Sequence, residues 1–162
     1  NRQEIPKKYD VLALVSGPEP QRQILEEIFQ REFKKHPGNV LLVKGVIEDE
    51  QTRHIEDNLT IYNYLSGQDL ENAFNESECI VSRSGYTTLM DVAKLDMKGF
   101  FIPTPGQFEQ KYLAKKLKKE GLAPSCKQSK FTVEKLEQIK DYQGLGHFGN
   151  NWVNLSDYFT LF

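Results

Sequence analysis

The chain has 162 residues, of which 38% are hydrophobic and 27% charged, and its formal net charge is −2. This length is typical of one domain with a buried core, and the composition argues against disorder of the whole chain. Because Lys and Arg are not in excess, we expect no nucleic-acid partner. No apolar run approaches the ~20 residues that span a bilayer.

Cysteine usage points to a reducing, cytoplasmic environment. Cys79 and Cys126 are the only cysteines, they lie far apart, and no His stands at zinc-binding spacing from them. Two small, partly buried thiols are the simplest interpretation. We therefore expect no metal site and no cofactor.

The first half of the chain alternates apolar runs with amphipathic stretches. Asn1–Lys8 is polar and predicts a linker. Residues 10–15 form a continuous apolar run, too short for a typical helix, which predicts a strand buried on both faces. Ser16-Gly17-Pro18 ends this strand, and Pro20 fits the first turn of a helix. The remaining elements predicted here are a helix striped by Leu25, Ile28, Phe29 and Phe33, and strands at Val40–Val43 and Leu59–Leu65.

The second half continues the same alternation. It first predicts a short helix with Leu70, Ala73 and Phe74 that starts near Ser66 or Asp69, then a strand at residues 79–81 and a helix with Leu89, Val92 and Ala93. A strand within residues 99–103 and a helix with Phe108, Leu113 and Leu117 that ends by Gly121 follow. The last predicted elements are a weak strand at residues 123–127 and a helix with Val133, Leu136 and Ile139. The predicted domain covers residues 9–142. Residues 143–162 are rich in Gly, Asn and aromatic side chains and predict a C-terminal tail that packs on this domain or on another one.

This alternation predicts an α/β fold, a Rossmann-like doubly wound parallel sheet. We expect five or six strands, right-handed crossover connections and helices on both faces. Ligands of such sheets bind outside the carboxyl ends of the strands. The strand-to-helix turns are therefore the candidate functional segments.

The turn after the first strand contains Ser16 and Gly17. The glycine lets the backbone approach a ligand, and the following helix offers N–H groups to an anion. Pro18 and Pro20 remove two of those donors, which makes the turn a poorer phosphate cradle than a glycine-rich loop. A tight turn before a proline-started helix is the structural alternative.

The turn after the fourth predicted strand is the strongest candidate. Ser84 is predicted to cap the next helix, and its spacing from Thr87, Thr88 and Asp91 puts the four on one face. Together with Arg83 and Gly85 they could hold a diphosphate, with Asp91 accepting hydrogen bonds from ribose. The alternatives are a simple cap, a carboxylate favoured by the helix dipole and a solvated Arg.

A third turn follows the fifth predicted strand and carries Glu109 and Gln110 in the first turn of its helix. Their carboxylate and amide groups suit sugar hydroxyls, which need both donors and acceptors. Solvated first-turn residues are the structural alternative.

These turns resemble those of the C-terminal domain of family 28 glycosyltransferases. The residues that carry the resemblance are Val81-Ser82-Arg83-Ser84-Gly85-Tyr86-Thr87-Thr88-Leu89-Met90-Asp91-Val92-Ala93, Phe101-Ile102-Pro103-Thr104-Pro105, Glu109-Gln110 and Leu113-Ala114. The resemblance spans residues 10–117. Asp91 stands where the family has a Glu, Lys111 replaces a second Gln, and the first loop has prolines in place of Gly and Gln.

The resemblance implies a GT-B enzyme whose C-terminal half binds a UDP-sugar donor similar to UDP-N-acetylglucosamine. It implies a diphosphate near Arg83, Ser84, Gly85 and Thr88, uracil against Leu65, the ribose at Asp91, the sugar at Gln110 and the family's first loop at Ser16 and Gly17. The catalytic base of the family belongs to the N-terminal, acceptor-binding domain, which this chain lacks. We therefore expect no catalytic residue here and an inactive chain when it is alone.

Other functions on the same scaffold remain open from the sequence. They are a nucleotide-sugar hydrolase or epimerase, a non-catalytic subunit that docks a separate acceptor-binding partner, and a binding module without activity. The basic run at Lys115, Lys116, Lys118 and Lys119 suggests a peripheral membrane contact, with the solvated face of a helix as the alternative.

Overall fold

The computed structural model of the protein describes residues 5–146. Its strands are β1 (Tyr9–Leu14), β2 (Val40–Val43), β3 (Arg53–Glu56), β4 (Leu59–Tyr62), β5 (Ser77–Ser82) and β6 (Lys98–Phe101). Its α-helices are α1 (Gln21–Phe33), α2 (Gly67–Asn75), α3 (Tyr86–Lys94) and α4 (Phe108–Lys119), followed by the 3-10 helices η1 (Gln128–Lys130) and η2 (Val133–Asp141).

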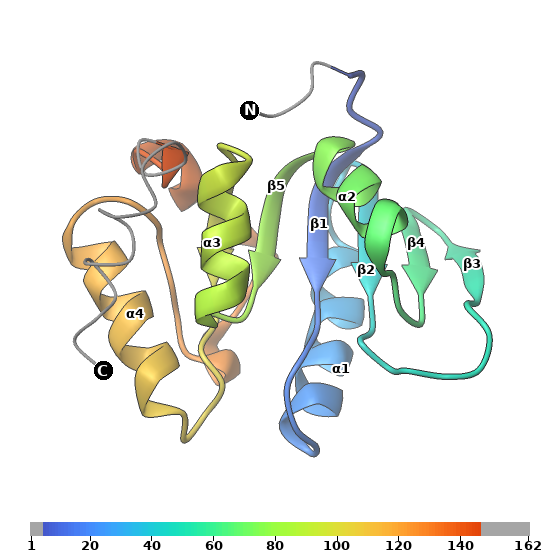
Figure 1. Ribbon diagram of the computed structural model, residues 1–162, viewed down its shortest axis with the longest axis horizontal. Helices are drawn as coiled ribbons and strands as arrows, with labels where there is room; N and C mark the ends of the chain where they lie inside the picture. Colours follow the sequence, from blue (N-terminus) through green and yellow to red (C-terminus); the bar gives the residue numbers. More distant parts are fainter. Residues whose placement is uncertain (1–4, 147–162) are drawn as a thin grey trace.

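The strands form one sheet in the order β3-β4-β2-β1-β5-β6. All neighbouring pairs are parallel except β3 and β4, which are antiparallel. The chain passes from β1 outward to β2 and β4, and later returns to the other side of β1 as β5. The direction of winding therefore reverses between β1 and β5, and the predicted doubly wound fold is confirmed. The carboxyl ends of the parallel strands lie along the lower edge of the sheet in Figure 1.

Hydrophobic cores cover both faces of the sheet. In β1, Val11 and Ala13 pack with α1 and η2 on one face, whereas Leu12 packs with α2, α3 and α4 on the other. Helices α2 and α3 lie in front of the sheet in Figure 1, and α1 lies behind it. The continuous apolar run of residues 10–15 is explained by this burial on two sides.

One strand and one helix differ from the sequence prediction. The edge strand β3 was not predicted, because its residues Arg53–Glu56 are mostly exposed and form no apolar run. In α4 the predicted apolar residues Leu113 and Leu117 are buried, but Phe108, predicted to lie on the same apolar face, is 85% exposed.

The region between α4 and residue 146 also differs. The weak strand predicted for residues 123–127 is reduced to a single bridge between Ser125 and Phe101. The segment predicted as an α-helix from residue 133 onward is the 3-10 helix η2. The third predicted strand corresponds to β4 and ends at Tyr62, before Leu65.

Both predicted flanks contain residues that contact the domain. The Lys8 N–H donates to the Glu76 carbonyl at 2.8 Å. At the other end the Gly144 N–H donates to the Leu122 carbonyl at 2.9 Å, and Leu145 is fully buried in the core. The rest of the predicted aromatic tail, residues 147–162, lies outside the described residues, so the domain scheme stays a prediction.

Candidate functional site

The loops at the winding reversal come from β1, β5 and β6. Gly17, after β1, has a φ of +104°, a left-handed conformation that a side chain rarely adopts. A β-carbon placed on Gly17 would lie 3.7 Å from the Thr104 hydroxyl oxygen, in the β6–α4 loop. Ser16 and Gly17 are exposed, so the predicted first loop reaches the surface beside the third one.

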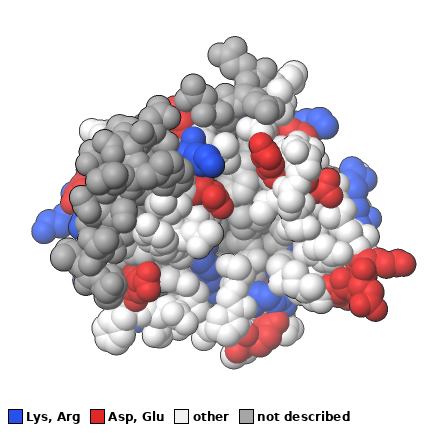
Figure 2. Space-filling view, viewed as in Figure 1, with Lys and Arg blue, Asp and Glu red and all other residues white. Residues whose placement is uncertain are grey.

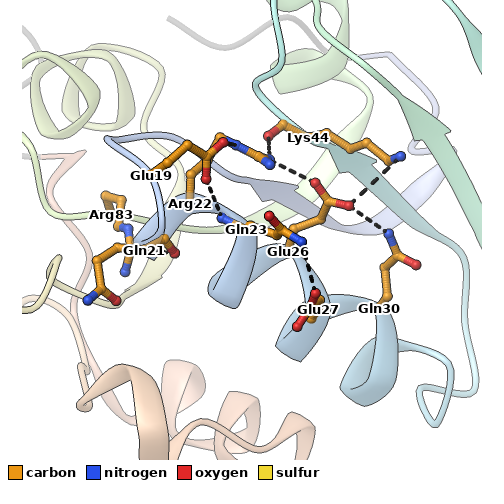
Figure 3. Close-up of polar contacts among 9 residues, drawn as sticks. All are labelled: Glu19, Gln21, Arg22, Gln23, Glu26, Glu27, Gln30, Lys44 and Arg83. Carbon is orange, nitrogen blue, oxygen red and sulfur yellow. Dashed lines mark hydrogen bonds and ion pairs between the residues drawn. The ribbon is translucent and has the colours of Figure 1, made fainter.

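The amino end of α1 is already occupied by protein groups (Figure 3). The Glu19 carboxylate accepts the Gln23 N–H at 3.1 Å and also the Arg22 Nε at 2.7 Å. The Arg22 N–H donates to the Pro18 carbonyl, and the Ile24 N–H donates to the Pro20 carbonyl. The hydrogen bond from Arg22 lowers the pKa of Glu19, which keeps a negative charge at this helix end. At this helix end an added anion would find three N–H groups already hydrogen-bonded, and the negative charge of Glu19 would repel it.

The amino end of α3 is open. Its N-cap residue is Gly85, no side chain caps it, and its first turn contains no acidic residue. Within residues 5–146 the N–H groups of Thr87 and Thr88 have no hydrogen-bond partner. Thr87 is exposed and Thr88 is half-buried. These donors and the positive end of the helix dipole are the groups that an anion at the loop after β5 would bind.

Ser84 was predicted to cap α3, and this prediction is wrong. The residue is fully buried, and its hydroxyl donates to the Gln110 carbonyl at 2.8 Å. Ser84 therefore links the β5–α3 loop to the first turn of α4, while the exposed Thr87 lies on the same turn as the open donors.

Arg83 is buried, so its interpretation as a solvated side chain is also wrong. Only 2% of its surface is exposed, and its guanidinium donates to the main-chain carbonyls of Gln21, Ile102 and Pro103. Figure 3 shows it beside Gln21, at the start of α1. Burial lowers the pKa of Arg83 to about 10, a value at which the group is still charged at neutral pH.

Gln110 is held in one orientation. Its side-chain oxygen accepts the Thr104 N–H at 2.8 Å, and a backbone N–H can bond only to the oxygen of the amide. The side-chain NH₂ group is thereby left as the part that can donate to a ligand. Glu109, next to it, is exposed and also lies in the first turn of α4.

Leu65 and Asp91 lie on opposite sides of α2. Leu65 lines a hollow of about 270 Å³ together with Asp69 and Ala73, whereas Asp91 lines a hollow of about 280 Å³ between α2 and α3. Desolvation in that groove raises the pKa of Asp91, and Lys94 partly offsets the effect. The structure thus brings together the loops of Gly17, Gly85 and Gln110, but places the residues predicted for uracil and ribose in separate hollows.

The sequence analysis assigned no role to three residues that shape these loops. Glu19 closes the end of α1, Thr104 orients Gln110, and Gln128 donates from its amide to the Gln21 side chain at 2.8 Å. Glu19 carried a usable signal, because an acidic residue four positions before Gln23 can accept a first-turn N–H. Gln128 carried none, since it is 107 positions from its partner.

Charge is unevenly distributed around the sheet. Figure 2 shows both signs on the front face and acidic side chains gathered at the lower right, where the β2–β3 loop runs in Figure 1. Glu48, Asp49 and Glu50 belong to this loop and line a hollow there. An anion is therefore disfavoured at that side of the carboxyl edge and favoured nearer to α3.

Two further features concern the described part of the chain. Among residues 5–146, no group of three or more His, Cys, Asp or Glu side chains is placed to hold a metal ion. No helix in this range is both long and apolar enough to cross a membrane.

This topology and these loops define a Rossmann-like α/β domain. The sequence profile described as the glycosyltransferase family 28 C-terminal domain matches residues 16–142, and the chain belongs to this family. The resemblance seen in the sequence is thereby confirmed.

Curated relatives carry the name UDP-N-acetylglucosamine–N-acetylmuramyl-(pentapeptide) pyrophosphoryl-undecaprenol N-acetylglucosamine transferase. The protein from Haemophilus ducreyi is 26% identical over 138 residues, which are 81% of this chain and 38% of the relative. The protein from Buchnera aphidicola is 30% identical over 94 residues, 56% of this chain and 27% of the relative. The chain thus spans well under half the length of these relatives.

Solved structures share the fold. MurG of Acinetobacter baumannii has a TM-score of 0.59 at 22% identity, with 85% of this chain and 41% of that chain covered. The glycosyltransferase SnogD from Streptomyces nogalater has a TM-score of 0.61 at 12% identity, with coverage of 99% and 40%. The NMR structure of ALG13 has a TM-score of 0.59 at 11% identity, with coverage of 86% and 90%.

Proposed function

We propose that this chain is the donor-binding half of a hexosyl-transferring glycosyltransferase of the GT-B type, with a UDP-sugar similar to UDP-N-acetylglucosamine as donor. The observation that carries the proposal is the open amino end of α3 at the winding reversal, next to the exposed Gly17 loop. Membership of family 28 and the donor that appears in the names of the relatives support the choice of ligand.

In this proposal the diphosphate binds at the start of α3. The N–H groups of Thr87 and Thr88, with their hydroxyls, donate to phosphate oxygens, and the helix dipole favours the negative charge. The same donors stabilise the charge that develops on the UDP leaving group when the bond to the sugar breaks. Gly85 and Gly17 let the main chain approach the ligand closely.

The sugar is proposed to lie toward the β6–α4 loop. The Gln110 NH₂ group donates to a sugar oxygen, because its own oxygen is already used by Thr104. Glu109 offers a carboxylate to hydroxyl protons. The ribose is assigned to Asp91 and the uracil to the region of Leu65, which requires a ligand that extends past the amino end of α2.

We propose that the acceptor and the general base are supplied by a partner domain outside this chain. No residue of the described loops is assigned to proton transfer, so the chain by itself is proposed to be inactive. Closure of the two halves around the donor would exclude water and complete the site.

A peripheral membrane contact at the cytoplasmic side is proposed for α4. This helix carries Lys111, Lys115, Lys116, Lys118 and Lys119. Lys111, Lys115 and Lys118 line a hollow of about 730 Å³, together with the apolar side chains of Pro103, Pro105 and Ala114. Lysine heads can contact anionic lipid while their stems cover apolar surface. Sedimentation with anionic and neutral vesicles tests this, and equal binding to both would contradict it.

Titration calorimetry with UDP, UDP-sugars and the corresponding adenine nucleotide tests the donor proposal directly. We expect uridine-dependent binding that weakens by ~1–3 kcal/mol in Asp91→Ala, the usual loss for a charged hydrogen-bond partner. Glu27→Ala, an exposed carboxylate on α1, serves as the control and should leave binding unchanged. Equal binding of adenine and uracil nucleotides would contradict the proposed donor. Release of free sugar from a UDP-sugar by this chain would favour a hydrolase.

A further inference from the structure

Arg83 joins three loops at the carboxyl edge of the sheet. It follows β5, and its guanidinium donates to the Gln21 carbonyl at 3.1 Å and to the carbonyls of Ile102 and Pro103 at 3.4 Å each. Gln21 begins α1, and Ile102 and Pro103 begin the β6–α4 loop. One side chain thereby fixes the position of both neighbouring loops against the α3 turn.

The charge of Arg83 is balanced in an unusual way. Within residues 5–146 no carboxylate forms an ion pair with it, and its Nε atom has no hydrogen-bond partner. Only main-chain carbonyl dipoles compensate a cation that is 2% exposed. A buried, unpaired charge is costly, and an apolar side chain would fill the end of β5 with less loss of solvation. Packing at the end of β5 therefore does not explain an Arg at this position, whereas its bonds to two neighbouring loops do.

The contacts of Arg83 continue to the proposed sugar-binding side chain. Pro103, whose carbonyl it holds, precedes Thr104, and the Thr104 N–H orients the Gln110 side chain. Ser84, the next residue after Arg83, holds the Gln110 carbonyl. Gln110 is thus held at its main chain by Ser84 and at its side chain by Thr104, and Arg83 bonds to the residue before Thr104.

We infer that Arg83 is a positioning residue that holds the α1 start and the β6–α4 loop in the geometry that binds a nucleotide sugar, without contacting the ligand itself. This inference rests on the proposed function and differs from the diphosphate contact that the family resemblance implies. The planar guanidinium suits the task because its two terminal nitrogens point to carbonyls on different loops. A lysine ammonium is a single point at the end of its stem and reaches one of the loops.

The first test uses the ligand-free chain. Hydrogen exchange is measured for wild type and Arg83→Lys at the amides of residues 102–110, with the amides of β1 and β2 as the internal reference. We expect exchange in the 102–110 segment to become about tenfold faster, because the loss of a hydrogen bond lowers the local opening free energy, while the reference amides keep their protection. Equal acceleration in both sets would mean a general loss of stability and would overturn the inference.

Arg22→Lys is the matched control. Arg22 is also buried at the start of α1, but its guanidinium binds Glu19, Glu26 and the Lys44 carbonyl, on the opposite side of the loop from β6. The same substitution there should leave exchange in the 102–110 segment unchanged. Should Arg83→Lys fail to fold, Arg83→Gln takes its place under the same criteria, since it removes the buried charge and keeps an amide donor.

The second test compares affinities for UDP and UDP-N-acetylglucosamine by calorimetry. A positioning role predicts that Arg83→Lys loses the gain in affinity that the sugar provides, together with the faster loop exchange. Weaker binding without any change in exchange would show direct contact with the ligand and overturn the inference. If the wild-type chain binds neither nucleotide, the proposed function fails, and the exchange data still decide whether Arg83 holds the loops.

Discussion

The orientation of the Gln110 amide yields a prediction that separates folding from ligand binding. In Gln110→Glu a carboxylate oxygen replaces the amide oxygen that accepts the Thr104 N–H at 2.8 Å, so the loop should keep its conformation. The second carboxylate oxygen then stands where the wild-type NH₂ group donates. A donor becomes a charged acceptor, while the size and shape of the side chain are nearly conserved.

The expected loss follows from that single exchange. A hydrogen bond to a sugar oxygen is lost and an acceptor faces an acceptor, which costs about 2 kcal/mol, or roughly 30-fold in dissociation constant. Calorimetry should show this loss for UDP-N-acetylglucosamine and a much smaller one for UDP, because the proposed site places Gln110 at the sugar and not at the uridine. The midpoint of urea unfolding should not fall.

Gln107→Glu is the matched control for the added charge. Gln107 is exposed, precedes the same helix and lies three residues away, so it introduces an equal charge near the loop without changing the Thr104 contact. An equal loss in both variants would attribute the effect to repulsion of the diphosphate. Unchanged affinity for the UDP-sugar in Gln110→Glu would refute the assignment of Gln110 to the sugar.

Two predictions concern the rest of the domain. Glu32 is buried in α1, and although burial opposes its charge, hydrogen bonds from the Val133 N–H, Lys35 and Arg31 together lower its pKa. The charged carboxylate therefore stabilises the fold fully above about pH 4.3, the ordinary glutamate value. This contribution is lost as the pH falls through the lower pKa of the folded state. In urea titrations at pH 7, Glu32→Ala should cost about 2 kcal/mol, a difference from wild type that shrinks at acidic pH; a pH-independent cost would contradict the argument. Burial raises the pKa of Cys126 to about 11, so at pH 8 its alkylation should be roughly 100-fold slower than that of a free cysteine, and an ordinary rate would disprove its protection.

The fold could be predicted from the sequence where burial is continuous. The run at residues 10–15 and Val40–Val43 are apolar because both faces of these strands are covered, and their positions were predicted within one residue. Strand β3 gave no such signal, because an exposed edge strand needs no apolar side chains. The 3-10 form of η2 could not be predicted, because the spacing of its apolar residues also fits an α-helix.

The candidate loops could be located from the sequence, but the directions of their side chains could not. Arg83 directly follows a buried strand, which predicts that it lies at the carboxyl edge of the sheet, and the structure places it there. Its burial depends on carbonyls 19, 20 and 62 positions away, and no local pattern encodes contacts at those separations. The same holds for Ser84, whose partner Gln110 is 26 positions away.

The two helix ends at the winding reversal differ in how well they can bind an anion. Pro18 and Pro20 lack N–H donors, the Glu19 carboxylate accepts the Gln23 N–H, and the N–H groups of Arg22 and Ile24 donate to the Pro18 and Pro20 carbonyls, so an anion is disfavoured at the start of α1. The start of α3 keeps its donors and has no acidic residue in its first turn. A diphosphate bound here is therefore expected closer to α3 than to α1, and the first loop would contribute backbone contact at Gly17 in place of phosphate binding. The prolines of the first loop are thus compatible with the proposed donor site, because the electrostatic attraction for the phosphates would come from the neighbouring helix α3.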